Sequence, residues 1–567
     1  MFVRNKLQEN INKILTYMKN SGFQFSAEKT TLIIFSGRHK VDKTNIYIKI
    51  NETKIFPSNK AKYLGVTFDD HLNWKNHIQD IIRKTDMIWG ILKSLKQTPG
   101  GNYIPNLLKV IHSLVRSKLS YGQEVYFSAN KSLLKSLQIK ECHFLRFALG
   151  LAPGTPQEIV YREAGWLPLD LERKLRCAQY FFRSKMVINS TNEELKETYD
   201  DLFYNENDNP PTNNINNVQR CIPFHYYIKN VINEANIDEN RIIQSAISPI
   251  PPWIMLPCTF DIDYANDYSK YDNQLYISQL AKERIYMNYY NHLKIYTDGS
   301  KLSTGEVGCA FYIPDLQIKQ RYKLNENISI FSAELFALYM TLNFINDFPR
   351  TIFQIVICSD SKSVLQALNA HQSKNRPNMI LECKILIHQI LSKGTQLALM
   401  WIPSHSGIRG NDFVDKEAKL AAQKDEIDFD IGLSLLEIYS KLKNTIKQEW
   451  DNQFECSKVV RNWNDYKRYE NPSFAHSLHP LFHRLRTGYT LYHYRQIKCI
   501  CNENLSCRHI FECNELIPKF ETLIQMLGSL GVSPTPALLL SKHEKFGWKI
   551  TEVFLRCLIS SDIGHLI

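Results

Sequence analysis

The hydrophobic positions between residues 290 and 425 change spacing several times, which predicts strands and helices that follow one another closely. Alternating apolar positions are typical of half-buried strands, whereas apolar positions three or four residues apart are typical of amphipathic helices. The pattern predicts strands at 292–299, 306–313, 318–324, 352–359 and 395–401, and helices at 330–346, 361–369, 376–392 and 409–423. Ser329 and Ser361 stand where the N-caps of two of these helices are expected.

The rest of the chain is predicted to be mostly helical. Helical spacing occurs at residues 7–18, 78–95, 104–182, 274–290 and 433–450, and short strands are expected at 29–35 and 63–68. The asparagine-rich segment 205–217 has little to bury, and the proline-containing segment 250–253 reads as an extended connector. We therefore expect a multidomain α+β and α/β protein with parts at 1–185, 186–289, 290–425 and 426–567.

Four acids in the predicted α/β unit occupy positions from which secondary structure would bring them together. Asp298 and Asp360 end two strands, Glu334 borders the apolar face of a helix, and Asp415 lies in the first turns of another. Such carboxylates repel one another unless hard divalent cations neutralise them. Oxygen ligands favour magnesium or manganese over zinc, and two ions about 3.5–4 Å apart would clamp an in-line phosphoryl displacement. The alternative for Asp298 is a simple hairpin turn with Gly299.

These motifs resemble type 1 ribonuclease H. The matching segments are Thr297-Asp298-Gly299-Ser300, Ser332-Ala333-Glu334, Ser359-Asp360-Ser361, and His405-Ser406-Gly407 followed by Gly410-Asn411 and Asp415. The resemblance implies a ribonuclease H-like five-stranded mixed sheet flanked by helices, with the first and fourth strands central. It also implies cleavage of the RNA strand of an RNA–DNA hybrid, leaving a 3′-hydroxyl and a 5′-phosphate.

The same resemblance implies roles for individual residues. Asp298, Glu334, Asp360 and Asp415 would be the metal ligands, and His405 would move a proton or help the product leave. Gly299, Ser300 and Asn411 would contact RNA hydroxyls and phosphates, although Asn411 is alternatively a helix cap. Asp412 and Glu417 are expected to be ordinary solvated acids. No basic, aromatic-rich insertion separates the helices near 370 and 376, so the substrate would be gripped by other parts of the chain.

The composition fits a partner that carries negative charge. The formal net charge is +12, which favours a polyanion, although a compositional bias of the coding genome would give the same excess. The 13 cysteines are scattered, and no signal peptide or membrane-length apolar run is evident. We therefore expect an intracellular protein, in the nucleus or the cytoplasm, with reduced thiols.

Residues 1–185 resemble the C-terminal part of a reverse transcriptase from a non-LTR retrotransposon, its last palm strands and thumb. The matching pieces are Gly22-Phe23, Tyr63-Leu64-Gly65-Val66, Leu72-Asn73-Trp74 and Gly165-Trp166-Leu167-Pro168-Leu169. Asp69 and Asp70 could be taken for the paired carboxylates of a polymerase, which lie on a strand–turn–strand hairpin. The pattern after them predicts a long helix and no return strand, so we interpret both as structural. The catalytic palm is expected to be absent, as in a truncated element or a gene model that begins mid-frame at Met1.

Residues 426–567 are predicted to form a helical tail with a Cys/His cluster. The same retrotransposon family often carries a similar Arg-Leu-Arg-Thr-Gly segment and Cys-Cys-His-Cys cluster. Candidate zinc ligands are Cys501 (or Cys499), Cys507, His509 and Cys513, and the alternative is reduced thiols in a small helical fold. Arg484 and Arg486, with Tyr489 and Tyr492, are either a single-strand binding segment or a plain amphipathic one.

Taken together, the sequence predicts a metal-dependent endonuclease of RNA–DNA hybrids in a retrotransposon-derived protein. One alternative is a nucleic-acid-binding remnant whose nuclease no longer works. Another is a reverse transcriptase that still polymerises.

Overall fold

We describe the fold from a computed structural model of the chain, which divides into two compact units. Unit 1 comprises Met1–Cys177, Asn216–Asn230 and Thr445–Ile567, and unit 2 comprises Ala178–Ile215 and Val231–Asn444. The structure describes residues 2–35, 43, 46–98, 103–186, 224–238, 241, 243, 257–264, 274–349, 352–371, 373–457, 475–488, 498–503, 509–510, 513–529, 539–543 and 546–560. The predicted connectors at 205–217 and 250–253 lie outside these residues.

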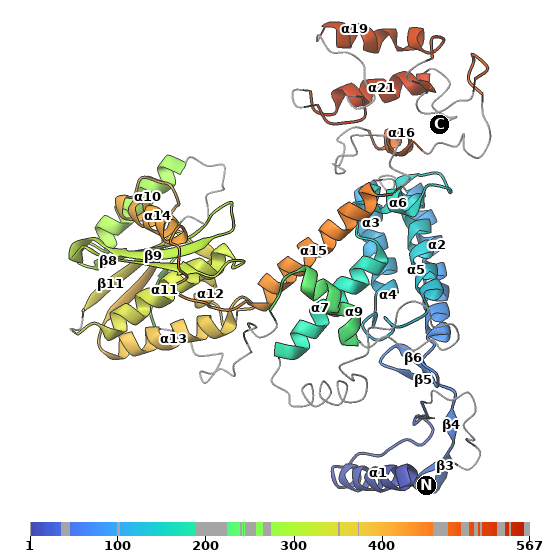
Figure 1. The fold of residues 1–567 in the computed structure, drawn as a ribbon, viewed down its shortest axis with the longest axis horizontal. Coiled ribbons are helices and arrows are strands. Elements are labelled where there is room, and N and C mark those ends of the chain that lie inside the picture. The colour runs from blue at the N-terminus through green and yellow to red at the C-terminus, as the bar shows by residue number, and fades with distance from the viewer. Residues whose placement is uncertain are drawn as a thin grey trace. The chain divides into compact units, whose positions relative to one another are not determined.

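Unit 2 is built on a six-stranded mixed sheet in the order β10-β9-β8-β11-β12-β7 (Figure 1). The strands are β7 (Thr259–Asp261), β8 (Leu293–Lys301), β9 (Val307–Ile313), β10 (Ile318–Leu324), β11 (Gln354–Ser359) and β12 (Gln396–Trp401). β8 pairs antiparallel with β9 and parallel with β11, which places the first and fourth predicted strands at the centre. The predicted sheet had five strands. The sixth, β7, was missed because three residues show no usable period.

Helices cover both faces of this sheet. One face packs against α11 (Ile330–Asp347), α12 (Lys362–Asn369) and α13 (Pro377–Ser392), through a core that includes Ile295. The other face packs against α10 (Gln274–Asn288) and α14 (Arg409–Ala422), through a core that includes Tyr296 (Figure 1). Neighbouring residues of β8 therefore point to opposite faces, as a pleated strand requires.

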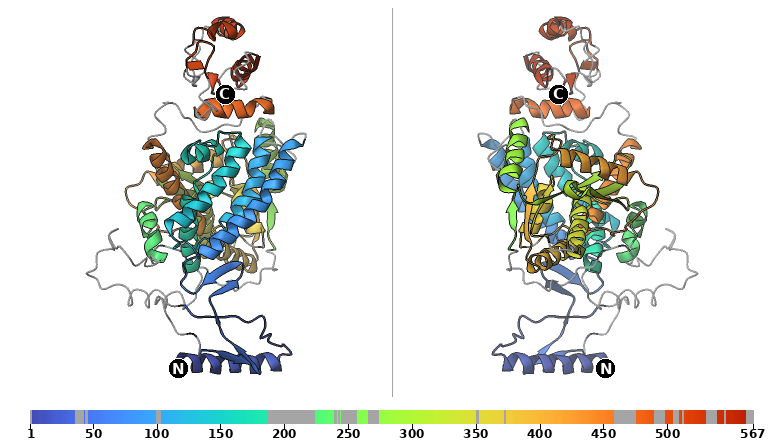
Figure 2. Two further views of the ribbon diagram at one scale, coloured as in Figure 1. Left: turned by 90° about the vertical axis from the view of Figure 1, so that its right-hand side faces the viewer. Right: turned by 90° about the vertical axis from the view of Figure 1, so that its left-hand side faces the viewer.

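Unit 1 begins with α1 (Phe2–Asn20) and the β5–β6 hairpin (Lys60–Tyr63 and Val66–Asp69). It continues with α2 (Lys75–Gln97), α3 (Ile104–Ile111), α5 (Lys131–Leu149) and α6 (Gln157–Ala164), and α2 packs against α5 (Figure 2). The strand predicted at 29–35 is only Leu32–Ile33. α7 (Leu169–Met186) and α15 (Leu435–Glu455) each contribute residues to both units.

The C-terminal helices share a hydrophobic core of their own. They are α16 (His479–Thr487), α19 (Glu521–Ser529) and α21 (Lys549–Ser560), and their core includes Phe482, Leu523 and Phe554. Among the described helices, none combines the length and apolar character required to cross a bilayer.

Candidate active site

The sheet and α11 bring three of the four predicted acids together. In the ladder between β8 and β11, Thr297 faces Ser359, so Asp298 and Asp360 follow side by side. Glu334 reaches the same point from the second turn of α11. One oxygen from each of Asp298, Glu334 and Asp360 lies within 4.8 Å of the others.

These carboxyl groups are held where they resist ionisation. Burial, together with the charges of Asp360 and Asp415, raises the pKa of Asp298 to about 8, an effect that Lys419 partly offsets. Burial, then the charges of Asp298 and Asp360, raises the pKa of Glu334 well above its usual value. Burial also raises the pKa of Asp360, against a hydrogen bond from Asn411. A bound cation would reverse these shifts, because an opposite charge favours the ionised form.

Two carboxylate oxygens in this cluster lack a hydrogen-bond partner in the part of the chain that the structure describes. They are Oδ2 of Asp298 and Oε2 of Glu334, and both are buried. A buried polar atom without a partner costs roughly 1–3 kcal/mol, so natural proteins seldom leave one unpaired. A set of carboxylate oxygens with unused lone pairs fits a hard divalent cation such as Mg²⁺ or Mn²⁺.

Asp415 lies near the cluster but outside the set of three. Its carboxylate pairs with Lys419 four residues later on α14, at 2.7 Å between Nζ and Oδ2. Its charge nonetheless raises the pKa of Asp298. Lys419 was not among the residues predicted for the site, although its i,i+4 spacing from Asp415 on a helix would have indicated the pair.

Gly299, Ser300 and Asn411, which were predicted to contact the substrate, are buried. A Cβ at Gly299 would lie 2.5 Å from the backbone nitrogen of Glu334, so the glycine allows α11 to approach β8 closely. The expected contact of Gly299 with a substrate stays a prediction. Ser300 is 7% exposed and Asn411 is 1% exposed. Asn411 hydrogen-bonds to Asp360, and the N-cap position of α14 belongs to Ile408. Asn411 therefore orients an acid and is not the helix cap that the alternative proposed.

His405 lies on the exposed loop before α14, with a left-handed backbone conformation at φ 50°. Its charge lowers the pKa of Asp360, so the imidazole is electrostatically close to the cluster. The loop is fastened to α10, because the Ser278 hydroxyl donates to the carbonyl of Ser406 at 2.5 Å. Sequence reasoning could not foresee this contact between residues far apart in the chain.

Glu417 is buried, which contradicts the prediction of a solvated acid. It is 6% exposed and pairs with Lys319 at 3.3 Å and Arg321 at 3.2 Å, both on β10. The prediction failed because the sequence does not show that β10 lies under this turn of α14.

A second buried ion pair holds the N-terminus of α11. Arg376 and Glu437 meet at 2.8 Å, and Arg376 also donates to Ser332 and to the carbonyls of Ile431 and Gly432. Glu437 accepts from the backbone and hydroxyl of Ser329 at 2.7 and 2.8 Å. An anion at a helix N-terminus is favourable, and this one fixes the helix that carries Glu334. Neither Arg376 nor Glu437 was predicted from the sequence to support the site.

The C-terminal part of unit 1 contains a separate cluster of soft ligands. Atoms of Cys499, Cys501, His509 and Cys513 all lie within 4.8 Å of one another. The sulfurs of Cys499 and Cys513 are 3.8 Å apart, and Cys501 Sγ is 3.2 Å from His509 Nε2. Cys507, a predicted ligand, lies outside the described residues, whereas both members of the Cys-x-Cys pair take part.

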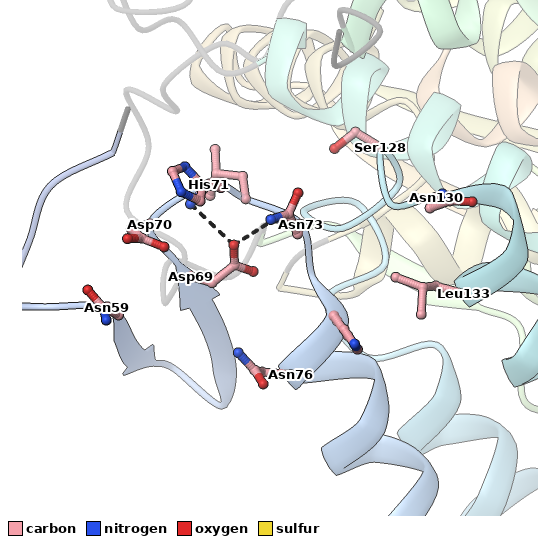
Figure 3. A pocket seen from close by; sticks show the side chains of 11 residues that line it. Asn59, Asp69, Asp70, His71, Asn73, Asn76, Ser128, Asn130 and Leu133 are labelled. Carbon is pink, nitrogen blue, oxygen red and sulfur yellow. Dashed lines mark hydrogen bonds between the residues drawn. The ribbon is translucent and has the colours of Figure 1, made fainter. Parts of the chain in front are cut away.

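Asp69 and Asp70 occupy structural positions beside a polar pocket in unit 1 (Figure 3). Asp69 accepts backbone N–H groups from His71, Asn73 and Trp74 at 3.2, 2.8 and 2.8 Å. Asp70 pairs with Lys43 at 2.6 Å. After β6 the chain turns into α2, so no return strand follows the acids, as predicted.

The two arginines of the Arg-Leu-Arg-Thr-Gly segment contact other parts of unit 1. Arg484 donates to the carbonyl of Gly150 at 2.7 Å, and Arg486 donates to the buried Glu163 at 3.2 Å. These contacts support the amphipathic alternative over single-strand binding. Tyr489 and Tyr492 lie outside the described residues.

A protein-family model and two solved structures match part of this chain. Residues 290–423 match the family model described as RNase H. The chain is also similar to the solved structure of LC11-RNase H1 in complex with RNA/DNA hybrid, with 18% identity over 23% of this chain and 98% of that chain, and a TM-score of 0.20. It is similar to RNase H1 from the halophilic archaeon Halobacterium salinarum NRC-1, with 19% identity over 23% of this chain and 97% of that chain, and a TM-score of 0.19.

Proposed function

We propose that this protein, whose residues 290–423 form an RNase H domain, cleaves the RNA strand of RNA–DNA hybrids by two-metal-ion catalysis. The observation that carries the proposal is the meeting of Asp298, Glu334 and Asp360, with two buried oxygens left without a partner. The expected products are RNA fragments that end in a 3′-hydroxyl and a 5′-phosphate.

Asp298, Glu334 and Asp360 would hold divalent cations, and Asp415 would join them once it is released from Lys419. When bound, two Mg²⁺ or Mn²⁺ ions would supply activation of water and stabilisation of the leaving oxygen. The protein itself orients the acids: the Asn411 side chain holds Asp360, and the Glu437–Arg376 pair fixes α11. His405, exposed at the edge of the cluster, would move a proton to or from the departing product.

The direct test is incubation of the full chain with Mg²⁺ and a hybrid whose RNA strand is end-labelled. Matched RNA and DNA duplexes of the same sequence serve as controls. We expect internal cuts in the RNA of the hybrid and none in either control duplex. Intact hybrid after prolonged incubation, with either Mg²⁺ or Mn²⁺, would refute the nuclease proposal.

The Asp415–Lys419 ion pair supports a second candidate, a protein that binds nucleic acid without cutting it. A lysine that neutralises one of the four acids lowers the attraction of the site for cations. The same incubation separates the two candidates, because the second predicts bound but uncut hybrid. Lys419→Ala would then raise metal affinity, which can be measured by calorimetry.

We further propose that the RNase H domain is part of a retrotransposon-derived protein in which residues 1–185 are a reverse transcriptase remnant. This proposal includes the division of the chain into parts at 1–185, 186–289, 290–425 and 426–567. It also includes an intracellular location. It is supported by the passage from β6 directly into α2 after Asp69 and Asp70. Primer extension on an RNA template tests the polymerase part: no nucleotide should be incorporated, and incorporation would contradict it.

We also propose that zinc binds to Cys499, Cys501, His509 and Cys513. Sulfurs about 2.3 Å from a tetrahedral zinc ion lie about 3.8 Å apart, which is the Cys499–Cys513 distance. His509 Nδ1 lies 3.3 Å from Glu503, an outer partner of the kind that orients metal-bound histidines. Elemental analysis should find one zinc per chain, lost in Cys501→Ser and kept in the control Cys557→Ser. Zinc-free wild type would contradict the site.

A further inference from the structure

Beside the acid cluster, unit 2 has an open hollow of about 540 Å³ that no part of the proposed reaction uses. It lies between α10, the start of β8 and the loop before α14. Its lining includes three cations, Lys282, Lys294 and Arg409, and three tyrosines, Tyr286, Tyr290 and Tyr296. α10 lies outside residues 290–423, so this hollow combines the RNase H domain with a helix that precedes it.

The cations in the hollow have no acidic partner in the part of the chain that the structure describes. No carboxylate lines the hollow, and none of Lys282, Lys294 and Arg409 forms an ion pair with an acid in the described ranges. Lys294 donates to the carbonyls of Tyr290 and His292, each at 3.1 Å, which holds its ammonium in place without cancelling the charge.

Several basic residues of unit 2 outside the hollow are paired with acids, whereas Lys301, Lys384 and Lys393 donate to carbonyl or amide oxygens. Arg284 pairs with Asp261, Arg376 with Glu437, and both Lys319 and Arg321 with Glu417. The three cations of the hollow differ from these four paired residues, because no ion pair with an acid in the described ranges holds them. A concave surface lined by one sign of charge raises the local concentration of ligands of opposite charge.

Two of the tyrosines are exposed beside these cations. Tyr286 is 65% exposed and Tyr290 is 67% exposed, and their ring centroids are 5.7 Å apart at an interplanar angle of 78°. Exposed aromatic rings next to lysine and arginine are typical of surfaces that track a nucleic-acid strand, where the cations contact phosphates and the rings stack on bases.

The hollow lies on the same side of the sheet as Asp298. Tyr296 and Asp298 are two residues apart on β8, so their side chains point to one face at a spacing of about 7 Å along the strand. Tyr296 packs against α14, because a Cβ at Gly410 would lie 2.2 Å from its ring. The loop lining at Gly407–Arg409 begins two residues after His405, and Ser278 of α10 fastens this loop.

We propose that this hollow binds the phosphodiester backbone of the nucleic-acid strand held at the nuclease centre, and that α10 is therefore part of the substrate-binding surface. The inference rests on the proposed function for the identity of the ligand. Lys282 and Arg409 contact phosphates, and Tyr286 stacks on a base or sugar. These residues bind and position the strand and do not touch the reacting atoms.

The test measures binding separately from cleavage. Anisotropy of a fluorescent hybrid is recorded with the full-length protein in EDTA, over a series of salt concentrations. For the double variant Lys282→Ala, Arg409→Ala we expect at least tenfold weaker binding at low salt. The slope of log K against log salt should fall by about two, since each lost phosphate contact removes about one.

Matched variants separate the hollow from a general effect of charge. Lys443→Ala removes an exposed lysine of α15 that does not line the hollow, and it should change affinity less than twofold. Tyr286→Ala should weaken binding about fivefold or more, whereas Tyr286→Phe should retain it. Circular dichroism of each variant checks that the fold is kept.

The outcomes distinguish this inference from the proposed nuclease activity. Hybrid that is bound through the hollow but never cut supports the inference and refutes the nuclease. Hybrid that is cut equally well by wild type and the double variant, with unchanged KM and salt slope, overturns the inference and leaves the nuclease intact. An acidic peptide that binds the hollow in preference to the hybrid would also overturn it.

Discussion

Replacing Asp298 by asparagine is expected to stabilise the metal-free protein while it removes the proposed activity. The wild-type carboxyl is buried beside Asp360 and Asp415, and its pKa is raised to about 8 from 3.8. At pH values between 3.8 and about 8, this carboxyl is protonated in the folded protein and ionised in the unfolded chain. Stability of the metal-free wild type therefore falls as pH rises through this window. The asparagine side chain of the variant has nearly the same shape but does not titrate. Its burial therefore involves no charge and does not depend on pH.

The size of the effect follows from the two pKa values. At pH 7 the cost of keeping this carboxyl protonated is about 4 kcal/mol, at 1.36 kcal/mol for each unit of pKa shift. The asparagine amide stays buried, and a buried amide group without a hydrogen-bond partner costs roughly 1–3 kcal/mol. We therefore expect Asp298→Asn to gain about 1–3 kcal/mol at pH 7 in EDTA, and less at pH 5.

The assay is thermal unfolding of wild type and variant in EDTA across pH 5 to 8, followed by a Mg²⁺ titration. The unfolding transition that responds to Mg²⁺ in the wild type identifies unit 2, because a ligand that binds only the folded state raises its stability. The variant should show a higher transition temperature in EDTA and a smaller Mg²⁺ response. A variant that is less stable than wild type in EDTA, with the same pH dependence, would refute the reasoning.

Three further predictions test how the site is supported. Glu437→Gln leaves Arg376 buried without its counter-charge and should cost about 3–5 kcal/mol in urea unfolding; a loss under 1 kcal/mol would mean that the pair does not hold α11. Gly299→Ala places a methyl group 2.5 Å from the Glu334 nitrogen and should cost about 1–3 kcal/mol with reduced activity, while an unchanged melting temperature would contradict the close approach. Ser278→Ala removes the bond to Ser406 and should lower kcat several-fold, with little change in stability, because the His405 loop is no longer fastened; unchanged kcat would remove that role.

The sequence predicted the elements of the α/β unit well because its hydrophobic periods are long and unbroken. The helix expected at 330–346 is Ile330–Asp347, and the strand expected at 395–401 is Gln396–Trp401. Ser329 caps its helix as expected, by accepting the backbone N–H of Ser332 at 3.2 Å. The order of acids along these elements was enough to place Asp298 beside Asp360, since parallel neighbours end at the same edge.

What the sequence could not predict are contacts between residues far apart in the chain. The burial of Glu417 depends on Lys319 and Arg321 in a strand about a hundred positions earlier. The close approach of the α11 backbone to Gly299 is another such contact. β7 is too short to show a period, and the hollow beside α10 forms only when a helix from outside the domain packs on the sheet.

The central claim is that Asp298, Glu334 and Asp360 form a catalytic centre, and single-turnover cleavage of a hybrid by wild type and Asp298→Asn tests it most directly. The full-length proteins would be compared in saturating Mg²⁺ with the same labelled substrate. We predict cleavage by the wild type and at least a hundredfold lower rate for the variant, which corresponds to about 2.7 kcal/mol of barrier. Equal rates for the two proteins would contradict the assignment.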